Sequence, residues 1–180
     1  MGSTEPRYDE AIDVRRAAEG DATAFERLYR SHVGRVHALA VRMVDRDSAE
    51  DLTQEVFIRA WRKLDTFRGS ARFGTWLHRL AVNHILSRRE TLRKLEARTA
   101  PGDDGLAHVA APRQRAPGLV VDVEAALERL PSRAKRVFVL FDVEGYSHEE
   151  IADLMDVSVG TSKSQLHRAR MLMRGFLEQA

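Results

Sequence analysis

The sequence predicts an all-α protein of two small helical domains joined by a flexible linker. Apolar residues recur at helical spacing along most of the chain, and no convincing run of alternating β-branched residues competes with this pattern. The pattern stops between Thr99 and Val121, where "APGDDGLAHVAAPRQRAPG" concentrates proline and glycine. We therefore expect a disordered tail over 1–8, a first domain over 9–98, a linker over 99–121 and a second domain over 122–180.

Local signals set the helix ends expected in the first domain. The segment 9–19 forms a short helix that Gly20 can end, and Asp21 can cap the next helix. A third helix starts at Asp47 or Ser48 and covers "SAEDLTQEVFIRAWRKLD". The loop "TFRGSARFG" follows, and a fourth helix starts at Thr75.

The second domain is expected to end in a helix-turn-helix. Helices are expected over 122–130, 132–143, 148–155 and 157–174. Ser147 and Glu150 have the spacing of a capping box, "DVSVG" supplies a tight turn, and Ser158 or Thr161 can cap the last helix. In such a corner the second helix lies in the DNA major groove.

One face of this last helix carries only positive charge. Its core stripe consists of Leu166, Ala169, Met173 and Phe176, and the opposite side consists of Lys163, Ser164, His167, Arg168, Arg170 and Arg174. An acid-free face suits contact with phosphates and base edges. Arg168 is suited to bidentate contact with guanine, and Ser164, Gln165 and His167 can also reach base edges.

The third helix is apolar over more of its circumference than a surface helix needs. The core stripe is Ala49, Leu52, Val56, Ala60 and Leu64, and a further face adds Gln54, Phe57, Ile58 and Trp61. Either this helix is buried on two sides, or the further face docks another protein. The residues alone leave both alternatives open.

The loop and the start of the fourth helix suggest contact with single-stranded nucleic acid. The aromatic residues Phe67, Phe73 and Trp76 lie among Arg68, Arg72 and Arg79. Bases stack on aromatic rings while guanidinium groups hold phosphates. Asn83 can pair with a base edge. The core spacing of Trp76 and Leu80, however, favours a mainly structural role for Trp76.

Composition and charge narrow the function further. The chain of 180 residues has a net charge of only +2, but 66–98 carries eight Lys/Arg against two Glu. Cysteine is absent, no apolar run is long enough to span a membrane, and the first ten residues lack the pattern of a secretory signal. We expect a cytoplasmic protein without a metal, a cofactor or membrane insertion.

Three segments together resemble the extracytoplasmic-function (ECF, group 4) RNA polymerase sigma factors of the sigma-70 family. They are "DLTQEVFIRAWRKLDTFRG", "FGTWLHRLAVN" and "LERLPSRAKRVFVLFDVEGYSHEEIADLMDVSVGTSKSQLHRAR". The resemblance covers 9–98 and 122–174. It implies a sigma region 2 bundle, a region 4 helix-turn-helix and no region 3 between them.

The resemblance also implies partners and residue roles. Core RNA polymerase is contacted at its β′ clamp helices through Asp51, Gln54, Glu55, Phe57, Ile58 and Trp61, and region 4 rests on the β flap. Region 2 opens and reads the minus-ten promoter element as duplex and single strand through Phe67, Arg68, Arg72, Phe73, Trp76, Arg79 and Asn83. Region 4 reads the minus-thirty-five element through His148, Glu149, Thr161, Lys163, Ser164, Gln165, His167 and Arg168. An anti-sigma factor is a further implied partner.

Two positions depart from the family pattern. Gln165 stands where an arginine is usual, which leaves the promoter sequence open. Gly74 replaces the aromatic or polar residue that many relatives carry after Phe73, and we expect it to loosen the base-capture loop.

Two other classes of protein compete with the sigma reading. A helix-turn-helix regulator with a dimerisation or sensor module would need neither the aromatic–arginine loop nor the docking helix. An enzyme is poorly supported, because "HEEIA" at His148 lacks the second histidine of a zincin and no phosphate-binding glycine loop occurs. We expect no catalytic activity.

Overall fold

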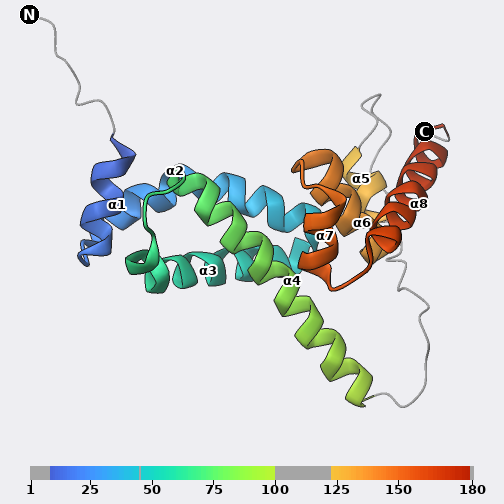
Figure 1. The fold of residues 1–180 in the computed structure, drawn as a ribbon, viewed down its shortest axis with the longest axis horizontal. Helices are drawn as coiled ribbons and strands as arrows, with labels where there is room; N and C mark the ends of the chain where they lie inside the picture. The colour runs from blue at the N-terminus through green and yellow to red at the C-terminus, as the bar shows by residue number, and fades with distance from the viewer. Residues whose placement is uncertain (1–8, 45, 100–122, 179–180) are drawn as a thin grey trace, which may run out of the picture. The chain divides into compact units, whose positions relative to one another are not determined.

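The structure, a computed structural model, describes residues 9–44, 46–99 and 123–178 (Figure 1). Every regular element in these ranges is a helix, so the predicted all-α fold is confirmed. The chain divides into two compact units, Met1–Ala40 with Asp47–Ile85 and Val41–Arg46 with Leu86–Ala180. The predicted tail and all of the predicted linker except Thr99 lie outside the described residues. No helix in the described ranges has the length and apolar character of a membrane span.

In the first unit, two aspartates begin the first two helices. The side chain of Asp9 accepts a hydrogen bond from the N–H of Ala11 and caps α1 (Glu10–Ala18). Gly20, with a φ of +98°, ends this segment as predicted. Asp21 Oδ1 accepts from the N–H groups of Thr23 and Ala24, at 2.9 and 3.1 Å, at the start of α2 (Ala22–Met43). The bond from Ala24 is the main cause of the lowered pKa of Asp21.

An ion pair joins α1 to α2. Asp13 is buried, and Arg27 donates from Nε to Asp13 Oδ2 at 2.9 Å. Hydrogen bonding to Arg27 is the main cause of the lowered pKa of the Asp13 carboxyl, and the positive charge of the guanidinium lowers it further. The short first helix is therefore anchored by charge as well as by its buried Val14 and Ala17.

The next two helices start earlier than the sequence indicated. Helix α3 (Arg46–Lys63) begins at Arg46, before Asp47 or Ser48, and a 3₁₀ turn, η1 (Leu64–Thr66), follows it. Helix α4 (Phe73–Thr99) begins two residues before the predicted Thr75. The expected core stripe of α3, from Ala49 to Leu64, is buried throughout.

The second unit contains a helical segment that changes type. Helix α5 (Val123–Glu128) precedes α6 (Ser132–Phe138), which passes into a π-helical turn, η2 (Val139–Val143). The sequence predicted one regular helix over 132–143. In the π turn the N–H of Glu144 bonds to the carbonyl of Val139, at 3.0 Å. Wider turns of this kind rotate the following side chains relative to an α-helix.

Helices α7 (His148–Met155) and α8 (Val159–Leu177) form the expected helix-turn-helix (Figure 1). The capping box of Ser147 and Glu150 is present, with the Glu150 N–H 3.2 Å from Ser147 Oγ. The turn depends on Asp156, whose φ of +50° is left-handed. Ser158 caps α8 by accepting from the N–H of Thr161, so Val157 and Ser158 precede this helix rather than begin it.

Candidate functional site

The outer face of α3 presents polar and apolar side chains together. At about 100° per residue, Asp51, Gln54, Glu55, Ile58 and Trp61 lie within an arc of about 120°. Ile58 is 53% exposed and Trp61 is 38% exposed, although both are large apolar residues. Asp51 and Gln54 are exposed and Glu55 is half-buried. We call this arc the α3 face.

Phe57 belongs to the core and not to the α3 face. It is only 4% exposed, and its ring packs edge-on against Tyr29 at 4.7 Å and Phe25 at 6.5 Å between centroids. Trp61 also packs on Phe25, at 4.8 Å, so one side of its indole is covered. As placed here, Phe57 cannot contact another protein directly. Of the two alternatives for α3, burial on a second side holds for Phe57, and docking of another protein by the exposed residues stays a prediction.

The aromatic residues of the loop form one cluster. The ring centroid of Phe67 lies 5.4 Å from that of Trp76 and 6.1 Å from that of Phe73. Phe73 is the buried member, at 2% exposed, whereas Phe67 and Trp76 are half-buried. Phe73 therefore cannot stack on a base without a rearrangement, while the other two rings keep part of their surface in solvent.

Four polar residues lie close to the cluster residues in sequence. Arg68, Arg72, Arg79 and Asn83 are exposed, the first two in the loop and the others on α4. The arrangement combines half-buried aromatic rings with guanidinium groups that are exposed to solvent. It therefore offers both elements of a surface for single-stranded nucleic acid.

His32 of α2 packs against the aromatic cluster. Its ring is 9% exposed and packs edge-on against Phe73 at 5.2 Å, and Nε2 lies 2.7 Å from Glu10 Oε1 of α1. Gly74 is not a loop residue but the second residue of α4, where a Cβ would lie 3.1 Å from His32 Cε1. The absence of a side chain at Gly74 lets α4 approach His32 closely. The sequence had instead suggested that this glycine loosens the base-capture loop.

The acid-free face of α8 is exposed as predicted. Lys163, Ser164, His167 and Arg168 are all exposed, and Gln165 and Thr161 are half-buried. Thr161 Oγ1 lies 2.9 Å from Ser158 Oγ, so this hydroxyl is part of the helix cap. The core stripe of Leu166, Ala169 and Met173 is buried on the other side. Phe176, the predicted fourth member, is half-buried beneath the guanidinium of Arg129, 3.9 Å from the ring centroid.

Two predicted contacts on α7 differ in their surroundings. Glu149 is exposed, but His148 is half-buried and bonds through Nδ1 to Ser162 Oγ, at 2.9 Å. The His148 ring also stacks on Phe141 of η2, with centroids 4.3 Å apart. Ser162 is fully buried in α8. His148 thus ties α7 to α8 and η2.

Arg170 is the exception on the basic face. It donates to both carboxylate oxygens of Asp142 in η2, and hydrogen bonding to Asp142 raises its pKa further. Its guanidinium also lies 5.7 Å from the centroid of the Phe141 ring. Asp142 balances the charge of Arg170 within the second unit, so this charge is not free for phosphate. The sequence predicted a basic face with no acid beside it, and for Arg170 that prediction is wrong.

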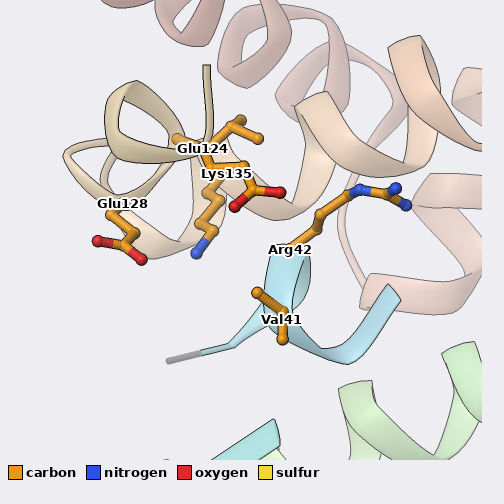
Figure 2. Close-up of a pocket in the computed structure, with 6 residues that line it drawn as sticks. Val41, Arg42, Glu124, Glu128 and Lys135 are labelled. Carbon is orange, nitrogen blue, oxygen red and sulfur yellow. The ribbon is translucent and has the colours of Figure 1, made fainter. Parts of the chain in front are cut away.

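The second unit has a pocket with a lining of its own. Figure 2 shows its lining, which consists of Val41, Arg42, Glu124, Leu127, Glu128 and Lys135. The ammonium of Lys135 donates to the carbonyl of Val44 at 3.2 Å. None of the residues singled out from the sequence lines this pocket, so it does not belong to the candidate site.

Sequence reasoning missed the residues that support the exposed ones. These residues contact partners on other helices or turns; they are His32, His84, Phe141 and Asp142. The shortest separation in sequence is the seven residues between Phe141 and His148. Helical periodicity reports only neighbours within one helix. Histidines at these positions were the one available signal, and seven histidines scattered along the chain did not distinguish the ones that contact other helices.

The fold and its surfaces define a helical DNA-binding protein with a second, separate interaction module. The family model described as Sigma-70 region 2 matches residues 28–95, and the model described as Sigma-70, region 4, matches residues 121–173. Among curated proteins, the ECF RNA polymerase sigma-E factor of Haemophilus influenzae is 34% identical over 185 residues, covering 94% of this chain and 95% of that protein. ECF RNA polymerase sigma factor SigE of Mycolicibacterium smegmatis is 38% identical over 168 residues, covering 89% of this chain but only 65% of the relative.

Solved structures agree with these matches. The sigma factor RpoE in complex with the anti-sigma factor NepR from Bartonella quintana superposes with a TM-score of 0.57 at 26% identity, covering 86% of this chain and 96% of RpoE. CnrH, in complex with the cytosolic domain of CnrY, gives a TM-score of 0.52 at 25% identity, with 94% and 97% covered. The chain belongs to the ECF RNA polymerase sigma factors of the sigma-70 family. Its function is to direct RNA polymerase to promoters for the initiation of transcription.

Proposed function

We propose that this sigma factor binds core RNA polymerase through the α3 face, on the β′ clamp helices. The observation that carries this assignment is the exposure of Ile58 and Trp61 beside the polar Asp51, Gln54 and Glu55. Large apolar residues at the centre of a polar rim are typical of protein interfaces. Phe57 holds Trp61 indirectly, by packing with it on Phe25, and takes no part in the contact surface.

The aromatic cluster and its arginines then open and hold the minus-ten element. Phe67 and Trp76 offer ring surface to unstacked bases, Phe73 supports them, and Asn83 reads a base edge. The exposed Arg68, Arg72 and Arg79 hold the phosphates of the open strand. Stacking contributes about 1–3 kcal/mol per base, and extruding a base costs a few kcal/mol, so two or three contacts suffice without ATP.

The exposed face of α8 reads the minus-thirty-five element in the major groove. The exposure of Lys163, Ser164, His167 and Arg168 supports their contact with bases and phosphates, and Gln165 is half-buried beside them. Glu149 and Thr161 lie near the ends of α7 and α8 that a helix-turn-helix turns toward DNA. His148 acts through its contact with Ser162 rather than as a free donor to phosphate. Region 4 also rests on the β flap.

The two reading surfaces belong to separate domains in this proposal. The first domain covers 9–98 and the second 122–180, with 99–121 as the tether that the polymerase holds. The protein has no catalytic activity of its own and works in the cytoplasm, where the polymerase meets DNA. An anti-sigma factor is a further partner, supported by the related RpoE, which was solved with the anti-sigma factor NepR.

A competition assay for core polymerase tests the docking assignment. We expect the double variant Ile58→Ala, Trp61→Ala to lose affinity by at least tenfold, because truncation of central apolar contacts costs more than about 1 kcal/mol each. Ile12→Ala is the matched control, since Ile12 is 49% exposed on α1, outside the α3 face. Equal affinity of the double variant and the wild type would refute the docking surface.

A further inference from the structure

His84 of α4 connects two charged residues of the docking helix. Its Nδ1 lies 3.0 Å from Arg59 Nη1, and its Nε2 lies 2.7 Å from Glu55 Oε2. The two partners are one helical turn apart on α3, and the histidine comes from the neighbouring helix. His84 is well covered, with 13% of its side chain exposed, while 36% of the Glu55 side chain is exposed.

The chemistry of the three groups fixes where the protons lie. A guanidinium can only donate hydrogen bonds, so Nδ1 must accept from Arg59 and carries no proton. A carboxylate can only accept, so Nε2 carries the proton and donates it to Glu55. The ring is therefore neutral in this arrangement, with one defined tautomer. Both of its nitrogens hold a long side chain of α3 in place.

We propose that His84 is a positioning residue for polymerase docking, which orients Glu55 and Arg59 before the polymerase binds. Long charged side chains lose conformational freedom when an interface orders them, and prior ordering removes that cost. Arg59 is exposed and lies one residue after Ile58, beside the α3 face, so it extends this surface with a positive charge. The surface that Arg59 meets on the polymerase should carry a carboxylate. The inference rests on the proposed docking role of α3.

The substitution His84→Phe separates positioning from packing. Phenylalanine keeps a planar ring of similar size but has no ring nitrogen to hold Glu55 or Arg59. We expect its dissociation constant for core polymerase to rise about two- to tenfold, the range of one or two lost polar contacts near a surface. His37→Phe is the matched control, because His37 is an exposed histidine of α2 whose Nδ1 lies 3.4 Å from Thr53 Oγ1. The control should bind core polymerase like the wild type.

A double-mutant cycle adds a readout that a purely structural role would not move. If His84 acts by orienting Glu55, then His84→Phe should have a smaller effect in a Glu55→Gln background than in the wild type. In the full chain, ¹⁵N spectra of the His84 ring should show the tautomer with its proton on Nε2. Thermal unfolding of each variant establishes that the fold is retained.

The outcomes distinguish this inference from the docking proposal. Loss of affinity in Ile58→Ala, Trp61→Ala together with wild-type affinity in His84→Phe would overturn the role of His84 alone. Additive effects of His84→Phe and Glu55→Gln, or a proton on Nδ1, would overturn it as well. If the α3 face variants also bind like the wild type, the docking assignment itself fails.

Discussion

Arg170 of α8 donates to both carboxylate oxygens of Asp142 in the π-helical turn, with its Nε 3.0 Å from Oδ2. The pair balances one positive charge on the helix face that we propose reads DNA, where the other charged side chains are lysine and arginine. Its partner Asp142 lies in the π-helical turn and not in α8. The number of phosphates that α8 can neutralise is therefore set partly outside α8.

Asp142→Asn should release that charge. We expect the slope of log K against log salt for duplex DNA to become steeper by about one unit, since each neutralised phosphate contributes about 0.9. Titrations of fluorescent duplex at several salt concentrations measure this slope. Asp153→Asn, at an exposed acid of α7, makes the same change in net charge and should leave the slope nearly unchanged. Equal responses from both variants would show that only net charge matters.

Substitutions of Arg168 and Lys163 should affect DNA binding in different ways. Arg168→Ala is expected to cost about 1–3 kcal/mol on the preferred upstream element and to relax preference at one base pair. Lys163→Ala should weaken binding to all sequences alike and reduce the salt slope by about one unit. Binding measured across a library of upstream elements separates the two effects. Uniform losses from both would argue against base reading by Arg168.

Gly74→Ala should destabilise the first unit, although alanine is normally the better helix former. The added Cβ would lie 3.1 Å from His32 Cε1, and His32 is held by Glu10 and Phe73. We expect a loss of about 1 kcal/mol or more in the free energy of unfolding, as in other overpacked cores. Denaturant titration of the full chain measures it.

Gly34→Ala is the matched control for this prediction. Gly34 lies within α2, and an added Cβ would meet no atom within 4 Å apart from its chain neighbours and its own helix backbone, so the same substitution should stabilise by about 0.5–1 kcal/mol. Opposite signs for the two variants are the expected result. Stabilisation by both would mean that His32 moves aside without cost.

The Asp13–Arg27 pair should make stability fall in acid. The pKa of Asp13 is lowered in the folded state, so its contribution is present above the unfolded value of about 3.9 and is lost as pH falls through the folded value. Asp13→Asn should therefore be destabilising at pH 7 and approach the wild type only as pH falls below the folded pKa of Asp13, which lies under the unfolded value of about 3.9. Unfolding followed at both pH values tests this. Glu26→Gln, in an exposed pair with Arg30, should change little at either pH.

The helices were predictable because their signals are local. Asp21, Ser147 and Gly20 act within one or two turns of their own position, and each has the predicted role at its helix end. Burial of Phe57 and Phe73 was not predictable, because it depends on α2 rings more than twenty residues away in sequence. The basic face of α8 was predictable from the sequence, but the partner of Arg170 was not. The regular helix predicted over 132–143 gave no reason to expect Asp142 beside Arg170.

The contact between His32 and Gly74 also limits how this protein can be recombined with its relatives. A chimera that imports only the segment 66–83 from a relative with a larger side chain after Phe73 would press that side chain against His32. The loop would then be displaced even though every transplanted residue is native to its donor. The smallest set of residues that can be exchanged with a relative therefore includes His32 and its partner Glu10 on α1. In this protein an exchange of the minus-ten specificity that we propose therefore needs parts of α1, α2 and α4 together rather than the loop alone.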